Sequence, residues 1–259
     1  MKMKKFLALL LALTVVLAFA ACAPADSNDS TPAVNDTTAA NDDTTAAGDD
    51  TTAADDVTVM SYAEYQAAEL ESEVVIEAYV QATQSWWENK ITVYTQDADG
   101  AYFIYELACS EEDAAKLVPG TKIRVTGYKG EWSGEIEIMD GTFEFVEGAD
   151  TFIAEPLDVT DLLGTDDLIK HQNKLVSFKG MTVEKVEYKN GEPGDDIYVT
   201  VSKDGKSYDF CVEIYLTGED TDVYKAVGEL KAGDVVDVEG FLYWYEGANP
   251  HITAVAAAK

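Results

Sequence analysis

The chain has 259 residues, of which 47% are hydrophobic, and 49 acidic side chains stand against 18 basic ones, for a formal net charge of −31. This length and hydrophobic content are sufficient for one or two globular domains. Nucleic-acid binding normally requires a basic surface, and the chain has a single arginine, Arg124. The composition therefore predicts that nucleic acid is not a partner.

The first 21 residues have the pattern of a bacterial signal peptide. Lys2, Lys4 and Lys5 give a positive start, and an apolar stretch too short for a permanent membrane helix follows. The segment ends in Phe19-Ala20-Ala21-Cys22, which resembles the lipobox of bacterial lipoproteins, although leucine is more usual where Phe19 stands. The resemblance implies acylation of Cys22, and with it a protein anchored to the cell membrane by lipid and facing the extracytoplasmic side. The alternative is an ordinary secretory signal with an accidental cysteine.

Residues 22–56 form a low-complexity acidic segment. Thr-Thr-Ala-Ala recurs three times, and nine aspartates but no basic or aromatic side chains lie between residues 23 and 56. Such a chain cannot bury enough apolar area to offset its ordering entropy, so we predict a disordered linker. Without the signal peptide and linker, residues 57–259 retain 15 basic and 40 acidic side chains, a net charge of −25.

The remaining sequence is an internal repeat of two units, 57–155 and 156–259, each of ordinary domain size. The segments 120–128 and 233–241 match each other: both have glycines seven residues apart, alternating apolar residues between them, and an aromatic residue after the second glycine. Alternation of this kind predicts a half-buried strand in each unit.

The elements predicted in each unit follow one order: strand, strand, turn, strand, short helix, strand, strand. In the first unit, the predicted first, second and fourth strands are 74–80, 91–96 and 120–128, the hairpin turn is Asp99-Gly100 and the short helix is 110–117. In the second unit, the corresponding strands are 176–183, 197–202 and 233–241, the turn is Asp204-Gly205 and the helix is 218–230. A helical segment is predicted before each unit, at 61–64 and at 158–163. Five strands with a helix between the third and fourth is the layout of an OB-fold. The predicted fold class is therefore all-β, with two consecutive five-stranded OB-fold-like barrels.

On this strand order and the glycine-bounded fourth strand, residues 57–259 resemble the OB-fold domains of Gram-positive exported lipoproteins, and are similar to the OB-like modules of secreted nucleases. The resemblance implies the fold. It implies no catalytic or ligand residue, because the sequence has no motif of that kind to match, and the nuclease part of such proteins is absent.

The sequence offers little for catalysis or metal binding. Cys109 and Cys211 stand in apolar strand patterns, which favours two buried thiols, with a disulfide between them as the alternative. His171 and His251 are far apart and lack neighbouring ligands. The segment 97–100 resembles a calcium loop but lacks its later oxygen ligands, so a hairpin turn explains it better. We predict no enzymatic activity, no metal site and no cofactor.

Aromatic residues are the best candidates for ligand contact. OB barrels bind ligands across strands two and three and the loops beside them, where all four tryptophans are predicted to lie. The candidate residues are Trp86, Trp87, Trp132, Tyr94, Tyr102, Tyr105, Tyr243, Trp244 and Tyr245. The alternative role is packing in the barrel mouths. Because side chains alternate along an extended chain, at least one of Trp86 and Trp87 should face solvent.

These observations predict a membrane-anchored extracytoplasmic binding protein whose ligand is a glycan or another neutral or cationic extracellular molecule. Two alternatives are a protein-interaction or assembly module of the cell envelope and a single-stranded nucleic-acid-binding OB module, and a third is a weak hydrolase. The first would show a large apolar patch, the second a basic groove beside the aromatic rings, and the third a pair of carboxylates in a cleft.

Overall fold

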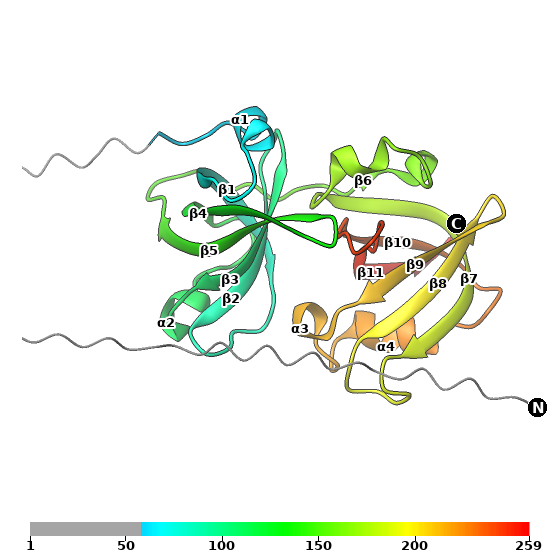
Figure 1. Cartoon of the computed structure of the whole chain (residues 1–259). Coiled ribbons are helices and arrows are strands. Elements are labelled where there is room, and N and C mark those ends of the chain that lie inside the picture. The colour runs from blue at the N-terminus through cyan, green and yellow to red at the C-terminus, as the bar shows by residue number, and fades with distance from the viewer. Residues whose placement is uncertain (1–57, 259) are drawn as a thin grey trace, which may run out of the picture. The chain divides into compact units, whose positions relative to one another are not determined.

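The computed structural model describes residues 58–258 (Figure 1). The predicted signal peptide, the predicted lipidation site Cys22 and the predicted linker lie outside the described residues. Within residues 58–258, no helix combines the length and the apolar character that a membrane crossing requires.

The first half of the described chain is a closed five-stranded barrel. Its strands are β1 (Glu73–Thr83), β2 (Lys90–Gln96), β3 (Ala101–Ala108), β4 (Lys122–Trp132) and β5 (Glu135–Phe145). Their order around the barrel is β1-β2-β3-β5-β4, and β4 pairs with β1 to close it. All pairings are antiparallel except that of β3 with β5, which is parallel. This is the OB-fold arrangement.

The second half repeats this topology. Its strands are β6 (Leu157–Asp158), β7 (Leu175–Tyr188), β8 (Ile197–Lys203), β9 (Lys206–Val212), β10 (Val235–Phe241) and β11 (His251–Ala257). The order β7-β8-β9-β11-β10 matches that of the first barrel, β10 pairs with β7, and β6 adds a short parallel edge beside β7. The fold is therefore all-β and consists of two consecutive OB-fold-like barrels, as predicted. The division into two domains at residue 156 stays a prediction, because the described residues, with both barrels, belong to one compact unit.

Short helices lie between the strands and before the barrels. They are α1 (Tyr62–Ala67), α2 (Glu111–Ala114), α3 (Ile214–Thr217), α4 (Asp222–Glu229) and the 3-10 turns η1 (Thr160–Leu162) and η2 (Leu168–His171). The predicted caps are present: Ser61 and Glu64 form a capping box on α1, and the Ser110 side chain accepts a hydrogen bond from the amide of Asp113. The predicted helix at 158–163 is only the turn η1, because the Asp158 carboxylate binds the Thr160 amide and fixes a tight local turn.

Each barrel has its own apolar core, and a third cluster joins the two. That third cluster is centred on Tyr94 and Phe103 of the first barrel and Phe241 of the second. Cys109 and Cys211 are buried free thiols, as favoured from the sequence. Burial raises the pKa of the Cys109 thiol to about 11, so this side chain is an unreactive apolar group at neutral pH.

Candidate ligand-binding cleft

The nine aromatic candidates divide into three groups by exposure. Trp87, Tyr105, Trp132 and Tyr245 are exposed; Trp86, Tyr243 and Trp244 are half-buried; Tyr94 and Tyr102 are buried. The exposure of Trp87 beside the half-buried Trp86 confirms that at least one of the two indoles faces solvent. The expectation that the whole sheet between the loops presents rings to a ligand is wrong for Tyr94 and Tyr102.

Two tertiary contacts explain these buried tyrosines. The second barrel covers Tyr94, whose ring stacks on Phe241 with centroids 4.5 Å apart. Tyr102 belongs to the core of the first barrel, where it makes edge contacts with Tyr62 at 5.5 Å and Tyr65 at 4.9 Å of helix α1. Only the end of the β2–β3 face near the loop after β1 is therefore open to a ligand.

Trp87 is held on a rigid turn at this open end. Its amide and carbonyl both bond to Lys90, at 2.9 Å each, and the two residues between them, Glu88 and Asn89, have φ values of 46° and 64°. Two consecutive positive φ values define a type I′ hairpin turn, whose twist matches that of the flanking strands. The exposed indole therefore projects from a preorganised hairpin.

Trp86 is the anchor of the same segment. Its indole N–H donates a hydrogen bond to the carbonyl oxygen of Cys109 at 2.9 Å, and its ring packs against the core of the first barrel. The adjacent tryptophans thus have different roles: Trp86 holds the loop against the barrel and Trp87 is exposed to solvent.

A β-bulge exposes Tyr105 and Glu106 together. The register of β2 and β3 shifts at this point, so that the pair lies opposite the single residue Thr92, whose hydroxyl accepts a bond from the Glu106 amide at 3.2 Å. Glu106 has a φ of 46°, which is uncommon for a residue other than glycine. Bulges re-aim side chains beside functional sites, and here two successive side chains point out of the barrel.

These residues line a cleft of about 480 Å³. Its exposed rings are Trp87 (72% exposed), Tyr105 (43%) and Tyr215 (62%). Tyr215 comes from α3 of the second barrel, and its carbonyl accepts hydrogen bonds from the amide (2.7 Å) and hydroxyl (3.2 Å) of Ser85. Sequence reasoning missed Tyr215 because it considered only loops of one barrel at a time, whereas this ring reaches the cleft through a tertiary contact.

Lys90 and Glu106 form the polar edge of the cleft. The Lys90 ammonium lies 2.6 Å from the Glu106 carboxylate, and this hydrogen bond, with the charge of the lysine, holds the pKa of Glu106 below its ordinary value. The cleft therefore combines three exposed rings with one donor and one acceptor, which suits a planar group with polar edges.

The other exposed candidates lie outside this cleft. Trp132 and Tyr245 pack on each other, with ring centroids 5.2 Å apart, where the hairpin of β4 and β5 meets the loop after β10. Trp244 is half-buried against Gly134, and a Cβ at that glycine would lie 2.7 Å from the indole Cδ1. This contact requires glycine, so the Trp244 ring serves the contact between the barrels.

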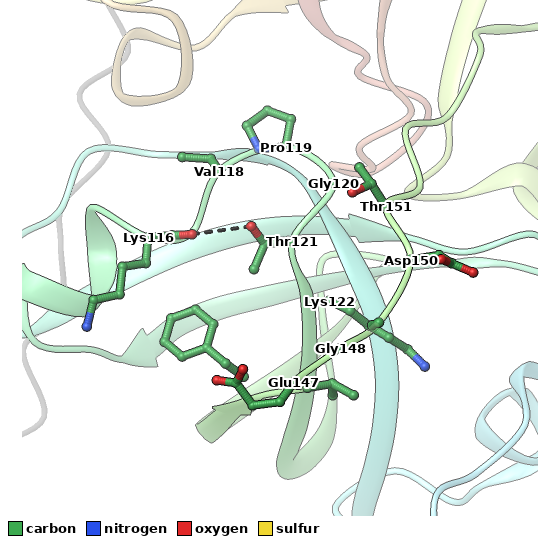
Figure 2. Close-up of a pocket in the computed structure, with 13 residues that line it drawn as sticks. Lys116, Val118, Pro119, Gly120, Thr121, Lys122, Glu147, Gly148, Asp150 and Thr151 are labelled. Atoms are coloured by element: carbon green, nitrogen blue, oxygen red, sulfur yellow. Dashed lines mark hydrogen bonds between the residues drawn. The ribbon is translucent and has the colours of Figure 1, made fainter.

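A second hollow, of about 540 Å³, lies beside the α2–β4 connection (Figure 2). Backbone and short side chains make up most of its wall, and the hydroxyl of Thr121 closes one side by bonding to the Lys116 carbonyl at 3.3 Å. Its one aromatic ring, Phe145, is half-buried and already lies 6.0 Å from the Lys116 ammonium. It presents no exposed ring, so the cleft at Trp87 is the better candidate.

Within residues 58–258, no group of three or more histidine, cysteine or acidic side chains is placed to hold a metal ion. Residues 97–100 form the predicted turn, in which the Asp97 carboxylate accepts hydrogen bonds from the amides of Asp99 and Gly100. That carboxylate already stabilises the loop.

No protein-family model matches the chain, and no curated protein matches it. Among solved structures, it is similar at 12% identity to a murine DNA-binding protein bound to double-stranded DNA, with 72% of this chain and 100% of that chain covered and a TM-score of 0.35. The Ifi202 HINa domain in complex with double-stranded DNA is also 12% identical, with 73% and 97% covered and a TM-score of 0.35. A replication protein A heterotrimer bound to single-stranded DNA is 12% identical, with 73% and 49% covered and a TM-score of 0.31.

These three similar structures are DNA complexes. They contradict the prediction that the ligand is a glycan or another neutral or cationic extracellular molecule, and the prediction that nucleic acid is not a partner. The second prediction rested on the acidic composition and on the expectation that single-strand binding needs a basic groove beside the aromatic rings. At 12% identity and TM-scores below 0.5, these matches do not identify the ligand of this chain.

Proposed function

We propose that the chain binds single-stranded nucleic acid by stacking unpaired bases in the cleft of the first barrel. The observation that carries this proposal is the convergence of three exposed rings, Trp87, Tyr105 and Tyr215, on one cleft at the open end of the β2–β3 face. OB barrels bind oligonucleotides on this face. Stacking of a base on an aromatic side chain contributes about 1–3 kcal/mol, and every base has a ring to stack.

The polar edge of the cleft supports the same ligand class. A nucleobase is planar and carries donors and acceptors on its rim, and Lys90 and Glu106 offer one donor and one acceptor beside the rings. The net charge of −25 on residues 57–259 opposes the phosphates. Binding must therefore come from the bases, and only a short stretch of nucleotides can take part.

We further propose that residues 1–56 place this binding activity at the outer side of a cell membrane. The lipobox-like Phe19-Ala20-Ala21-Cys22 and the acidic segment that follows it support a lipid anchor and a spacer. The ligand would then be extracellular nucleic acid. We propose that the protein acts by binding.

Oligothymidylate and an abasic oligonucleotide of the same length test the proposal. Fluorescence anisotropy of the labelled oligonucleotides should show binding of the first and not of the second, because only bases can stack. Trp87→Ala should abolish the binding, and Trp132→Ala, which removes an exposed indole outside the cleft, should leave it unchanged. Equal binding of both oligonucleotides, or none of either, would overturn the proposal.

A protein partner is the second candidate function, and the strong negative charge favours it. Exposed rings on a chain whose residues 57–259 carry a net charge of −25 suit a basic segment of another protein, through apolar contact and charge attraction. The same Trp87→Ala variant would lose this partner. The salt response separates the two candidates, because attraction between opposite charges weakens with salt and repulsion between like charges is relieved by it.

A further inference from the structure

A buried carboxyl group lies at the contact between the two barrels. Glu135 is the first residue of β5 and its side chain is fully buried. Its Oε2 accepts hydrogen bonds from the amide of Trp244 at 2.8 Å and from Nε2 of Gln172 at 3.1 Å, both of which belong to the second barrel. The same hairpin makes three further bonds to that barrel, from Gln172 Nε2 to the Gly134 carbonyl, from Asn173 Nδ2 to the Ile136 carbonyl and from the Glu246 amide to the Ser133 carbonyl. Glu135 thus takes part in a set of hydrogen bonds between this hairpin and the second barrel.

The second carboxyl oxygen of Glu135 has no hydrogen-bond partner within residues 58–258. The same is true of Oδ1 of Asn173, whose carboxamide lies beside the Glu135 carboxyl group. Burial of an ionised carboxylate is strongly unfavourable when one of its oxygens has no hydrogen-bond partner. A neutral carboxylic acid has an O–H to donate, and a nearby carboxamide oxygen is a suitable acceptor. Hydrogen bonds from Trp244, Gln172 and Asn173 favour the ionised carboxylate, but burial outweighs them, so the net effect of the surroundings favours the protonated acid.

The groups around Glu135 do not supply a positive charge. The titratable side chains that face it are Glu137 on the same strand, Tyr65 of α1, Tyr94 of β2 and Tyr243 after β10. In the described part of the chain, neither Glu135 nor Glu137 has an ion pair.

The buried ammonium of Lys129 has other partners. It donates to the backbone carbonyls of residues 65, 66 and 68 at the end of α1. Burial raises the pKa of Glu135 to about 8 and that of Glu137 to about 7.

We propose that Glu135 is a proton-controlled latch between the barrels: its neutral form holds them together, and its ionisation releases the hairpin of residues 133–136 from the second barrel. The charge formed on ionisation would be fully buried, near Glu137 and without a cation. Separation of the barrels exposes the carboxylates of Glu135 and Glu137 to water, which lowers the free energy of their ionised forms.

The latch controls the cleft as well, and this part rests on the proposed function. Tyr215 reaches the cleft from the second barrel, whereas Trp87 and Tyr105 belong to the first. Release of the hairpin weakens the contact that keeps Tyr215 beside the other two rings, and the bonds from Ser85 to the Tyr215 carbonyl then hold it less firmly. Base stacking in the cleft would then weaken at the pH that ionises Glu135.

The direction of the pH dependence follows from the raised pKa. Between the ordinary pKa of a glutamic acid and the raised value of about 8, the docked state binds a proton that the separated state does not. Docking is therefore strongest below the ordinary pKa, and it weakens as the pH rises towards and through 8.

Hydrogen exchange of the full chain without ligand tests the latch. The amides of Trp244 and Glu246 donate across the contact, so their protection reports docking directly. From about pH 6 to about pH 9, after correction for intrinsic exchange, their protection should fall by about tenfold or more, whereas amides of the barrel cores stay protected. Glu135→Gln, which keeps a neutral group of the same shape, should lose most of this fall. Glu131→Gln, which removes an exposed charge from the same hairpin, should retain it.

Equal pH responses of the wild type and Glu135→Gln would overturn the latch. If that variant does not fold, a carbon NMR titration of the glutamate carboxyl groups in the wild type decides instead, and an ordinary midpoint for Glu135 overturns the proposal. Neither measurement contains nucleic acid, so the latch stands or fails separately from the proposed function. Oligothymidylate binding that follows the same midpoint would support the link between the two, and binding independent of this midpoint would refute that link.

Discussion

The hydroxyl group of Tyr94 lies 2.7 Å from Nδ1 of His251, and both side chains are buried. Tyr94 belongs to β2 of the first barrel, and His251 begins β11 of the second. The His251 ring also stacks on Tyr243, with centroids 4.3 Å apart. Much of the face that an isolated OB barrel offers to its ligand is therefore an interior contact between two barrels.

This hydrogen bond should contribute measurably to stability. Tyr94→Phe removes the hydroxyl and leaves Nδ1 of a buried histidine without its partner, which should lower the free energy of unfolding by about 1–3 kcal/mol. Chemical denaturation measures this change. Tyr198→Phe, at a ring that is 41% exposed, is the control and should change stability by less than about 0.5 kcal/mol. Equal losses in both variants would contradict a specific role for the Tyr94–His251 bond.

His251 should make the fold sensitive to acid. Burial lowers the pKa of His251 to about 3, against an ordinary value of 6.5, so the unfolded chain takes up a proton that the folded chain excludes. This contribution to stability is complete above pH 6.5 and is lost as the pH falls towards 3. Denaturation between about pH 7 and about pH 4 should show a shallower loss in His251→Gln than in the wild type. Parallel curves would show that His251 is not the group that titrates.

The repeat, the strand order and the caps could be predicted from the sequence because each depends on local signals. The paired glycines of 120–128 and 233–241 and the alternating residues between them recur in both barrels as β4 and β10. Ser61 and Ser110 cap their helices through atoms three residues away, so their roles are visible in a short stretch of sequence.

The ligand face could not be predicted in the same way, because the contact between the barrels decides it. The alternation of side chains along β2 predicts that Tyr94 points out of the first barrel, but the second barrel covers it. Tyr105 and Glu106 face outward together because of a bulge, which alternation does not predict. Glu135 stands between Gly134 and Ile136 with no sequence sign of full burial, since its partners Gln172 and Trp244 are distant in the chain.

The adjacent tryptophans Trp86 and Trp87 should respond differently to truncation. Trp86→Ala removes a half-buried ring that packs against the core, and with it the hydrogen bond to Cys109, which should cost about 3 kcal/mol of unfolding free energy. Trp87→Ala removes a ring that is 72% exposed, so stability should change by less than about 0.5 kcal/mol while oligonucleotide binding is lost. Thermal unfolding and binding measured on both variants separate the two roles. A strongly destabilised Trp87→Ala would show that this indole has a structural role.

The proposed lipid anchor depends on one side chain, Cys22. Cys22→Ser should abolish metabolic labelling with a fatty acid and move the protein from the membrane fraction to the soluble or secreted fraction, because acyl chains contribute about 0.8 kcal/mol per buried methylene group to membrane binding. Cys109→Ser, at a buried thiol, is the matched control and should keep both the label and the location. Membrane association that survives Cys22→Ser would exclude the anchor.

The salt dependence of oligonucleotide binding should have the opposite sign to that of ordinary nucleic-acid-binding proteins. Those proteins lose affinity as salt rises, because their basic side chains release counterions from the phosphates. Residues 57–259 carry a net charge of −25, and the one lysine that lines the cleft, Lys90, is paired with Glu106. Added salt therefore screens a repulsion, and the affinity of oligothymidylate should rise between about 0.01 M and about 0.15 M salt, where the Debye length falls from about 30 Å to about 8 Å. Lys90→Gln should weaken binding without reversing this trend, since the overall field stays negative. Affinity that falls steeply with salt would mean that phosphate contacts dominate, and the base-stacking mechanism would then be wrong.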